Sequence, residues 1–222
     1  MELHHAILAT DVLLFTFREG GLWVRTIKVD RPPYFVNMEG FPGGLIKPEE
    51  NAETAALRCL KEKAGISSKL FVEQLYAFSE IDRDPRGRVV SVAYLACVPW
   101  DDLSEQEQAD QDMTAWRPVD GLGKLAYDHN DMLKFALEWL KSKIKSTNLP
   151  AWLMPKEFTL TELQSCYENL LKVKLDKRNF RKKILQLNVL KLLAKKTEGL
   201  KNRPAQLYQF SSKKVTVSGN LI

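Results

Sequence analysis

The chain has 222 residues, 45% of them hydrophobic, which is enough for one large domain or two modest ones and too apolar for a disordered chain. It contains no run of about 18 apolar residues, so a transmembrane helix is not expected, and its first residues lack the basic start of a secretory signal. We therefore expect a cytoplasmic protein with no membrane partner. The cysteines Cys59, Cys97 and Cys166 are odd in number and far apart in apolar segments, which predicts buried free thiols rather than disulfides or a zinc site.

The net charge of +5 is unevenly distributed along the chain. Residues 148–222 contain 15 lysines and arginines against five acidic residues, a net charge of +10, which leaves a net charge of −5 for residues 1–147. This asymmetry predicts two domains, 1–147 and 148–222, with different partners. A polyanion is the expected partner of the basic domain.

The first domain shows the pattern of mixed strands and helices without regular alternation. Its expected elements, in chain order, are strands at 6–17 and 21–29, a Pro- and Gly-rich loop at 30–44, a helix at 50–64, strands at 70–80 and 89–100, and an amphipathic helix at 128–144. A tight turn joins the first two strands into a hairpin. Asp128 or Asn130 is expected to cap the last helix.

The second domain shows, after an expected linker at 146–155, the pattern of a helix-turn-helix. Thr159 and Glu162 have the spacing of a capping box at the start of its first helix. Asp176 is positioned to cap a second helix at 177–187. Two strands that follow would form the hairpin of a winged helix, at 189–197 and 205–211.

The segment "GGLIKPEENAETAALRCLKEKAGI", residues 43–66, resembles the Nudix box, whose pattern is G-x5-E-x7-R-E-U-x-E-E-x-G-U with U apolar. The segment "FPGG" precedes it as expected. Cys59 and Lys63 depart from the pattern, because each replaces a glutamate. The positions that agree are Gly44, Glu50, Arg58, Leu60, Glu62, Gly65 and Ile66. An amphipathic helix after a glycine-rich turn would also explain part of this pattern.

The two departures bear directly on catalysis. Positions 59, 62 and 63 lie on one helix face, because they are spaced i, i+3 and i+4. Three carboxylates there would bind hard divalent cations, which neutralise a diphosphate and activate water. Here Cys59 is neutral and Lys63 offsets Glu62. We therefore expect no catalytic residues, and Glu50, Arg58 and Glu62 are remnants of the box. We also expect no metal site other than a residual ligand at Glu62, and no required cofactor, with magnesium used only if hydrolysis persists.

Other residues of the first domain are candidates for contacts with a ligand. Arg83 and Arg86 lie in the loop "RDPRGR", and arginine forks suit phosphate oxygens, although a solvated hairpin turn would contain the same residues. His129, beside a helix start, is suited to bind a ligand or to support the helix cap. Phe41 is suited to stack on a base or to pack in the core.

The second helix of the basic domain has two different faces. Phe180, Ile184 and Leu187 share an apolar face on a helical wheel. The other face carries side chains that contact base edges and phosphates in the major groove. A run of charge is usually a solvated face, but the helix-turn-helix spacing and the net charge favour DNA. The expected DNA-binding residues of the helix and wing are Lys177, Arg178, Asn179, Arg181, Lys182, Gln186, Lys196, Lys201 and Arg203.

Nearly the whole chain resembles the Nudix-related transcriptional regulators, the NrtR family. The similar segments are "FPGG", "EQLYAFSEIDRDPRGRVVSVAYLA", "DHNDML" and "FTLTELQSCYENLLKVKLDKRNFRKKIL". The resemblance implies an α+β chain, with an N-terminal Nudix-like α/β/α sandwich followed by a C-terminal winged helix-turn-helix domain. It also implies a homodimer that represses genes of NAD metabolism from a duplex DNA operator and senses ADP-ribose or a related diphosphate nucleoside.

A degenerate box suits such a receptor, because a ligand that is not cleaved persists as a signal. We expect the effector to contact Phe41, Gly43, Gly44, Lys63, Arg83, Arg86 and His129. Three alternatives remain open at this point. They are an active Nudix hydrolase that holds metal through Glu62, Glu50 and Glu53 or Glu80, a sugar-sensing regulator of the same family, and an RNA-binding protein, since winged helices also bind RNA.

Overall fold

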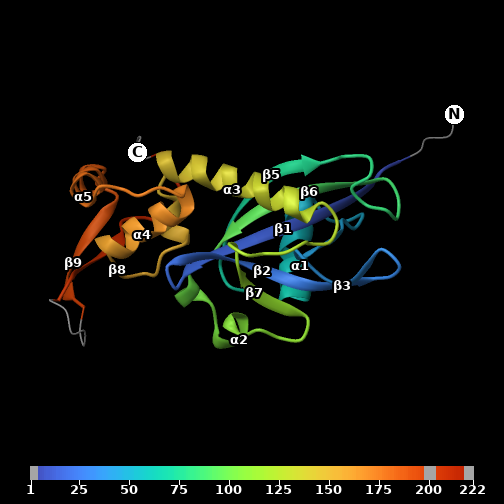
Figure 1. Ribbon diagram of the computed structural model, residues 1–222, viewed down its shortest axis with the longest axis horizontal. Coiled ribbons are helices and arrows are strands. Elements are labelled where there is room, and N and C mark those ends of the chain that lie inside the picture. Colours follow the sequence, from blue (N-terminus) through green and yellow to red (C-terminus); the bar gives the residue numbers. More distant parts are fainter. Residues whose placement is uncertain (1–4, 198–203, 218–222) are drawn as a thin grey trace.

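The computed structural model describes residues 5–197 and 204–217 and shows an elongated molecule with the winged helix at one end of its long axis (Figure 1). The described part of the first domain is built on a seven-stranded sheet in the order β3-β2-β1-β6-β5, with β4 paired to β1 and β7 paired to β2. Only β1 and β6 pair in parallel among these strands. The strands are β1 (Ile7–Arg18), β2 (Gly21–Arg31), β3 (Phe35–Gly40), β4 (Gly43–Leu45), β5 (Phe71–Phe78), β6 (Val89–Cys97) and β7 (Thr114–Pro118).

The helices of the first domain are α1 (Ala52–Ala64), the short α2 (Glu105–Gln108), α3 (His129–Ser146) and a 3₁₀ turn, η1 (Trp100–Asp102). The second domain contains η2 (Leu149–Trp152), β8 (Phe158–Thr159), α4 (Leu160–Leu171), α5 (Lys177–Gln186), β9 (Leu190–Lys196) and β10 (Gln206–Phe210). None of the helices within the described residues is long and apolar enough to cross a membrane.

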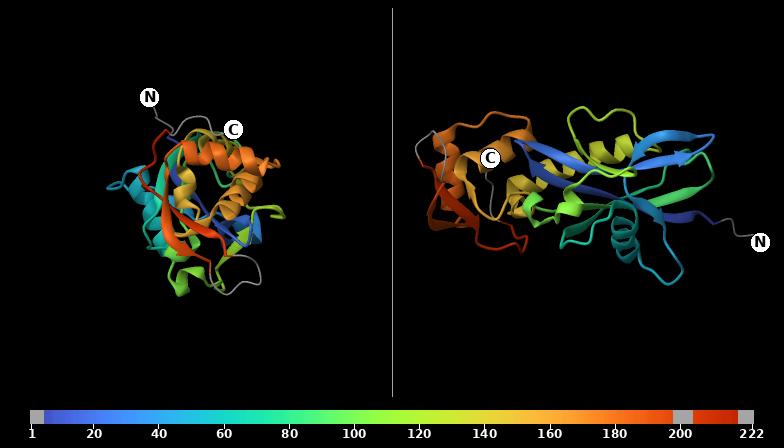
Figure 2. Two further views of the ribbon diagram at one scale, coloured as in Figure 1. Left: turned by 90° about the vertical axis from the view of Figure 1, so that its left-hand side faces the viewer. Right: turned by 90° about the horizontal axis from the view of Figure 1, so that it is seen from below.

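The alternation of side chains along β1 builds two cores, one on each face of the sheet. Val12 and Leu14 pack with Leu60 of α1, whereas Leu13 and Phe15 pack into a core shared with α3. The sheet therefore lies between α1 and α3 (Figure 2). This arrangement confirms the predicted α/β/α sandwich.

The expected loop at 30–44 is wrong, because the segment contains β3 and β4. Pro32 and Pro33 lie in a turn after β2, and β3 then pairs antiparallel with β2 through partners such as Lys28 and Glu39. The two prolines lie outside the strand, so the backbone of residues 35–40 is free to pair with the exposed edge of β2. The strand β7 was also missed, since it adds to the other side of the same β2.

The N-cap residues of the long helices cap them with their side chains, as their residue types favour, except at α3. Asn51 accepts a hydrogen bond from the backbone of Thr54 and begins α1. Asp128 occupies the N-cap position of α3, but its side chain does not cap the helix because both of its oxygens are bonded to Arg83. Asn130 instead accepts a hydrogen bond from the backbone of Leu125. The predicted side-chain cap of α3 is therefore wrong.

The second domain is the predicted winged helix. Thr159 and Glu162 form the capping box of α4, and Asp176 caps α5 by accepting a hydrogen bond from the backbone of Asn179 at 2.8 Å. The strands β8, β10 and β9 form a three-stranded sheet, in which β8 was not predicted. Part of the expected wing loop, including the candidates Lys201 and Arg203, lies outside the described residues.

The expected linker at 146–155 is wrong. Every residue from Thr147 to Met154 is buried, and one continuous core extends from the sheet through α3 and η2 to α4 and α5. Asn148 also holds the chain that follows β10, donating to the carbonyl oxygens of Ser212 and Lys214 and accepting from the backbone of Thr216. The two domains therefore share a packed boundary rather than a flexible connection.

All three cysteines are buried and free, as predicted.

Candidate functional site

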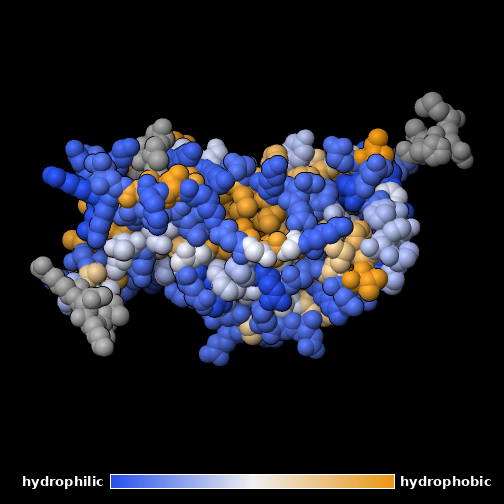
Figure 3. Space-filling model, viewed as in Figure 1, coloured by the Kyte–Doolittle hydropathy of each residue, from blue (hydrophilic) through white to orange (hydrophobic). Residues whose placement is uncertain are grey.

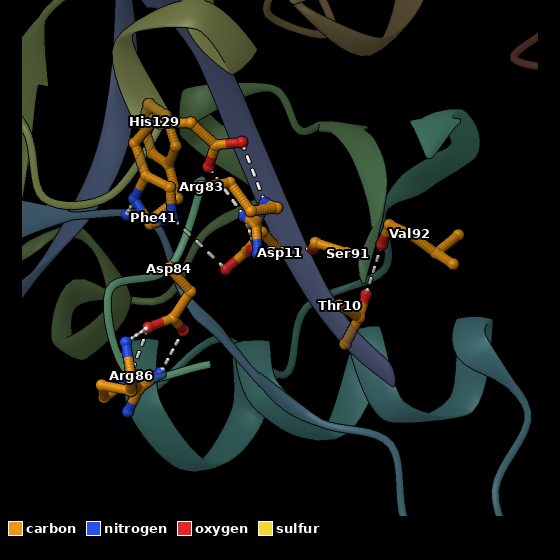
Figure 4. Close-up of polar contacts among 10 residues, drawn as sticks. Thr10, Asp11, Phe41, Arg83, Asp84, Arg86, Ser91, Val92 and His129 are labelled. Carbon is orange, nitrogen blue, oxygen red and sulfur yellow. Dashed lines mark hydrogen bonds and ion pairs between the residues drawn. The ribbon is translucent and has the colours of Figure 1, made fainter. Parts of the chain in front are cut away.

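The centre of the candidate ligand site is Asp11, an acidic residue in the middle of the apolar strand β1 (Figure 4). Its Oδ2 accepts a hydrogen bond from Ser91 Oγ at 2.6 Å and lies 3.5 Å from Nη2 of Arg83. Burial by itself would raise the pKa of Asp11, but His129, Ser91 and Arg83 together lower the pKa below its usual value. Asp11 is therefore a buried carboxylate that organises the groups around it.

His129 joins α3 to this carboxylate. The backbone N–H of Phe41 donates to Nδ1 of His129 at 2.9 Å, and Nε2 of the same ring faces Asp11 Oδ1 at 3.5 Å. The Phe41 ring, which is 1% exposed, stacks on the imidazole with centroids 5.2 Å apart. A Cβ at Gly43 would lie 1.9 Å from Asp11 Oδ1, so only glycine permits this close approach.

The two loop arginines are in different situations. Arg83 makes a bidentate pair with Asp128, at 2.9 and 2.7 Å, and its side chain is 3% exposed. Arg86 pairs with Asp84 but is 44% exposed, and its guanidinium lies over the ring of Tyr127. The guanidinium of Arg83 is therefore already paired with Asp128 inside the protein. Arg86 has an outer edge available to a phosphate.

A cavity of about 680 Å³ opens beside this network, between β5 and the first half of α3. Tyr76, Phe78 and Phe135 form an aromatic cluster on its wall, with centroids 4.9–5.9 Å apart. Arg83 and Asp128 also line it. Aromatic walls with a few polar groups are typical of sites for small organic ligands.

The remnants of the Nudix box form a clamp within the protein. Arg58 donates to both oxygens of Glu50, at 2.6 and 3.0 Å, to Glu62 at 3.2 Å and to the carbonyl oxygen of Leu45. The hydrogen bonds with Arg58 lower the pKa of Glu50. These residues fasten α1 to the segment that precedes it.

The neighbouring box positions do not fit the divalent cation that a Nudix hydrolase uses. The ammonium of Lys63 donates to the carbonyl oxygen of Gly43. Burial raises the pKa of the Cys59 thiol, although Lys63 and Arg58 oppose this effect, so the group is neutral near pH 7. Within the described residues, no group of three or more His, Cys, Asp or Glu side chains is arranged to hold a metal ion.

The helix α5 presents a basic face at the far end of the molecule. Phe180 and Ile184 are buried against the rest of the domain, as predicted, and Leu187 packs partly against the same core. Arg181 is half-buried and donates to Thr161. Hydrophilic side chains cover much of the end of the molecule that carries α5 (Figure 3). The exposed candidates are Lys177, Arg178, Asn179, Lys182, Gln186 and Lys196.

The fold brings together most of the residues expected at the ligand site. Phe41, Gly43, Arg83 and His129 meet around Asp11, Arg86 lies on the adjoining loop, and Gly44 and Lys63 lie beside Gly43. Asp11, the cavity aromatics and the pairing of Asp128 with Arg83 were not predicted from the sequence. An aspartate within "AILATDVLLFTF" was the available signal, since a carboxylate in a buried strand requires partners.

Comparison with known proteins agrees with this architecture. Residues 7–139 match the NUDIX domain and residues 150–210 match the NrtR DNA-binding winged helix domain. The ADPR responsive transcriptional repressor NtrR of Acinetobacter baylyi is 34% identical over 212 residues, which cover 92% of this chain and 82% of that protein.

Two solved structures add to the comparison. Shewanella oneidensis NrtR complexed with a 27mer DNA has a TM-score of 0.80 at 31% identity, covering 92% of this chain and 93% of that one. The NUDIX domain of the same protein complexed with ADP ribose has a TM-score of 0.52 at 29% identity, covering 62% and 90% of the two chains. The chain is therefore a Nudix domain joined to a winged helix. It belongs to the NrtR family, which confirms the predicted family and fold class.

Proposed function

We propose that this protein is a transcriptional repressor that binds duplex DNA through its winged helix and responds to ADP-ribose held by its Nudix domain. The observation that carries the proposal is the path of α3. Its first residue, His129, belongs to the Asp11 network, and its last turns enter the core shared with α4 and α5. A change at the ligand site is thereby coupled to the position of the DNA-binding helix. The repressor from Acinetobacter baylyi and the two Shewanella oneidensis complexes support this assignment.

The proposal extends to the operator, the oligomeric state and the regulated genes. One recognition helix reads only a few base pairs, so a homodimer that places two helices on half-sites about one turn of DNA apart is the expected form. The acidic first domain is the natural place for contacts between the two copies. Genes of NAD metabolism are the proposed targets, and the cytoplasm is the proposed location. The Nudix domain acts as a receptor without turnover.

Selection of duplex sites from random DNA, followed by gel-shift titration, tests the function. We expect a palindromic site to be enriched, a dimer to bind it, and ADP-ribose to change the affinity by a factor of about 5–150. By linkage, DNA must change the affinity for ADP-ribose by the same factor. Enrichment of RNA but not duplex DNA, or a response only to a free sugar such as arabinose, would refute the assignment. So would turnover of ADP-ribose near 1 s⁻¹ with magnesium, roughly the low end of ordinary enzymes.

A further inference from the structure

The face of α1 that carries the Nudix box positions contains a positively charged side chain, Lys63. The ammonium of Lys63 donates to the carbonyl oxygen of Gly43. A Cβ at Gly44 would lie 3.1 Å from Lys63 Nζ and 3.2 Å from Cys59 Sγ, so the ammonium and the thiol both lie against this glycine. Carbonyl and carboxylate oxygens are the ligands that hard divalent cations prefer. Here the carbonyl oxygen is already bonded to the ammonium.

The carboxylates that remain in the box are also engaged. Arg58 binds both oxygens of Glu50 and one oxygen of Glu62. An incoming divalent cation would therefore have to compete with Arg58 for these carboxylates and also withstand repulsion from Lys63. Both effects oppose metal binding at the same place.

The ammonium of Lys63 is well placed to bind an anion. Lys63 is exposed, and an ammonium has three N–H donors, of which Gly43 takes one. Gly43 itself is fixed, because it pairs with Asp11 in the β1–β4 ladder and touches the Asp11 side chain closely. The carbonyl that anchors Lys63 therefore belongs to the best-packed part of the site.

The aromatic cavity is a poorer place for a diphosphate. Glu80, Asp82, Asp131 and Glu138 line it, together with Asp128, whereas its cations are Lys134 and the already paired Arg83. This excess of negative charge would repel phosphate groups.

We propose that Lys63 replaces the divalent metal of a Nudix enzyme as the cation that binds the ligand's diphosphate, so that the ligand binds without Mg²⁺. This inference rests on the proposed function in one respect, namely that the effector carries a diphosphate. It accounts for retention of the Nudix frame, since the helix face that presents the box positions now holds an ammonium against the carbonyl oxygen of Gly43. An ammonium neutralises phosphate charge but does not activate water as a metal does.

Calorimetric titration of the full chain with ADP-ribose, in EDTA and in Mg²⁺, tests the proposal. Wild-type affinity should be the same in both buffers. Lys63→Gln should weaken binding about tenfold or more, because a hydrogen bond to a charged group is lost. Lys61→Gln is the matched control, since Lys61 is exposed on the same helix but two residues away and on a different face. Binding that is lost in EDTA, or a Lys63→Gln variant that binds like wild type, would overturn the proposal.

Binding of Mn²⁺ alone, followed by electron paramagnetic resonance, provides a test without nucleotide. Wild type should bind Mn²⁺ more weakly than Lys63→Glu and than the double variant Cys59→Glu/Lys63→Glu, because each restores a carboxylate near Gly43. Equal or tighter binding by wild type contradicts the proposal. If ADP-ribose does not bind wild type at all, the proposed function fails. The Mn²⁺ comparison and titration with inorganic pyrophosphate still decide whether Lys63 replaces the metal.

Discussion

The cationic side chains of the two domains differ in what surrounds them. In the first domain, Arg25 is fully buried and donates to backbone carbonyls and to Thr114, and Arg83 is buried between two carboxylates. In the winged helix, Arg178 and Lys182 are exposed, and no carboxylate of the described residues lies within 4 Å of either. Arg25 and Arg83 therefore hold the fold of the first domain, whereas Arg178 and Lys182 are presented to solvent. Substitutions should separate stability from DNA affinity accordingly.

The largest expected effect is that of Arg83→Ala. It leaves the carboxylates of Asp128 and Asp11 without their buried partner, and loss of one partner from a buried pair typically costs about 3–5 kcal/mol of stability. Urea denaturation measures the change in the free energy of unfolding. Arg178→Ala is the control and should change this free energy by no more than about 0.5 kcal/mol. Equal stability losses in the two variants would remove the distinction between the domains.

Glu107→Gln tests whether a buried carboxylate of the first domain also stabilises the folded state. Glu107 accepts hydrogen bonds from the backbones of Ser67, Ser68 and Ser104 and from the hydroxyls of Ser68 and Ser104. An amide turns one acceptor into a donor that faces these donors, so we expect a loss of about 2–3 kcal/mol by denaturation at neutral pH.

The pH dependence of Glu107 has a defined sign. Although burial opposes the shift, its hydrogen bonds lower the pKa of Glu107 from 4.5 to about 2. Because the folded pKa is the lower one, the stabilisation is complete above pH 4.5 and is lost as the pH falls towards 2. Wild type should therefore lose more stability than Glu107→Gln between these pH values. Parallel curves for the two proteins would show that Glu107 is not a stabilising carboxylate.

Arg178→Ala should act on DNA binding where Arg83→Ala acts on folding. Loss of a contact to a base edge should cost about 1–3 kcal/mol of binding free energy and relax specificity at one position of each half-site. Gel shifts on single-base variants of the selected operator measure both effects. Lys61→Ala, which removes an exposed lysine on α1, is the control for loss of one positive charge and should leave the specificity unchanged.

Lys196→Gln should give the smallest and least specific effect. Lys196 is exposed on β9, where a phosphate contact is expected. Its loss should weaken all sequences alike and reduce the magnitude of the salt slope by about one unit. Affinity measured over a series of salt concentrations provides the test. A sequence-dependent effect would place Lys196 at a base rather than at the backbone.

Much of the fold was predictable because its signals are local. The hairpin of β1 and β2, the helix α1, the capping box of α4 and the cap of α5 at Asp176 all depend on side chains within a few residues of each other. The Nudix box was recognisable for the same reason, since its fixed positions occur within one short segment. The strands β4 and β7 were missed because their partners, β1 and β2, are distant in the chain. The strand β3 pairs with the preceding β2, and it was missed because its segment is rich in proline and glycine.

Several residues that the structure brings together at the candidate site were predicted from the sequence, but the contacts between them were not. Arg83 and His129 were predicted to contact the ligand, but their shared partner Asp11 and the pair between Arg83 and Asp128 were not predicted. A guanidinium in a polar loop has the same local sequence whether it faces solvent or a buried carboxylate. The DNA-binding and effector-binding residues remain predictions that the experiments above address.

The sequence alone determined the order of the two domains, the local caps of most helices and the replacement of box glutamates by Cys59 and Lys63. These features depend on residue type and on spacings of a few residues. Only the tertiary structure decided that residues 147–154 are core, that Asp128 binds Arg83 instead of capping α3, and that Lys63 contacts Gly43. The physical reason is that burial and ion pairing depend on which distant segments pack together, and that choice depends on the whole sheet and its two covering layers.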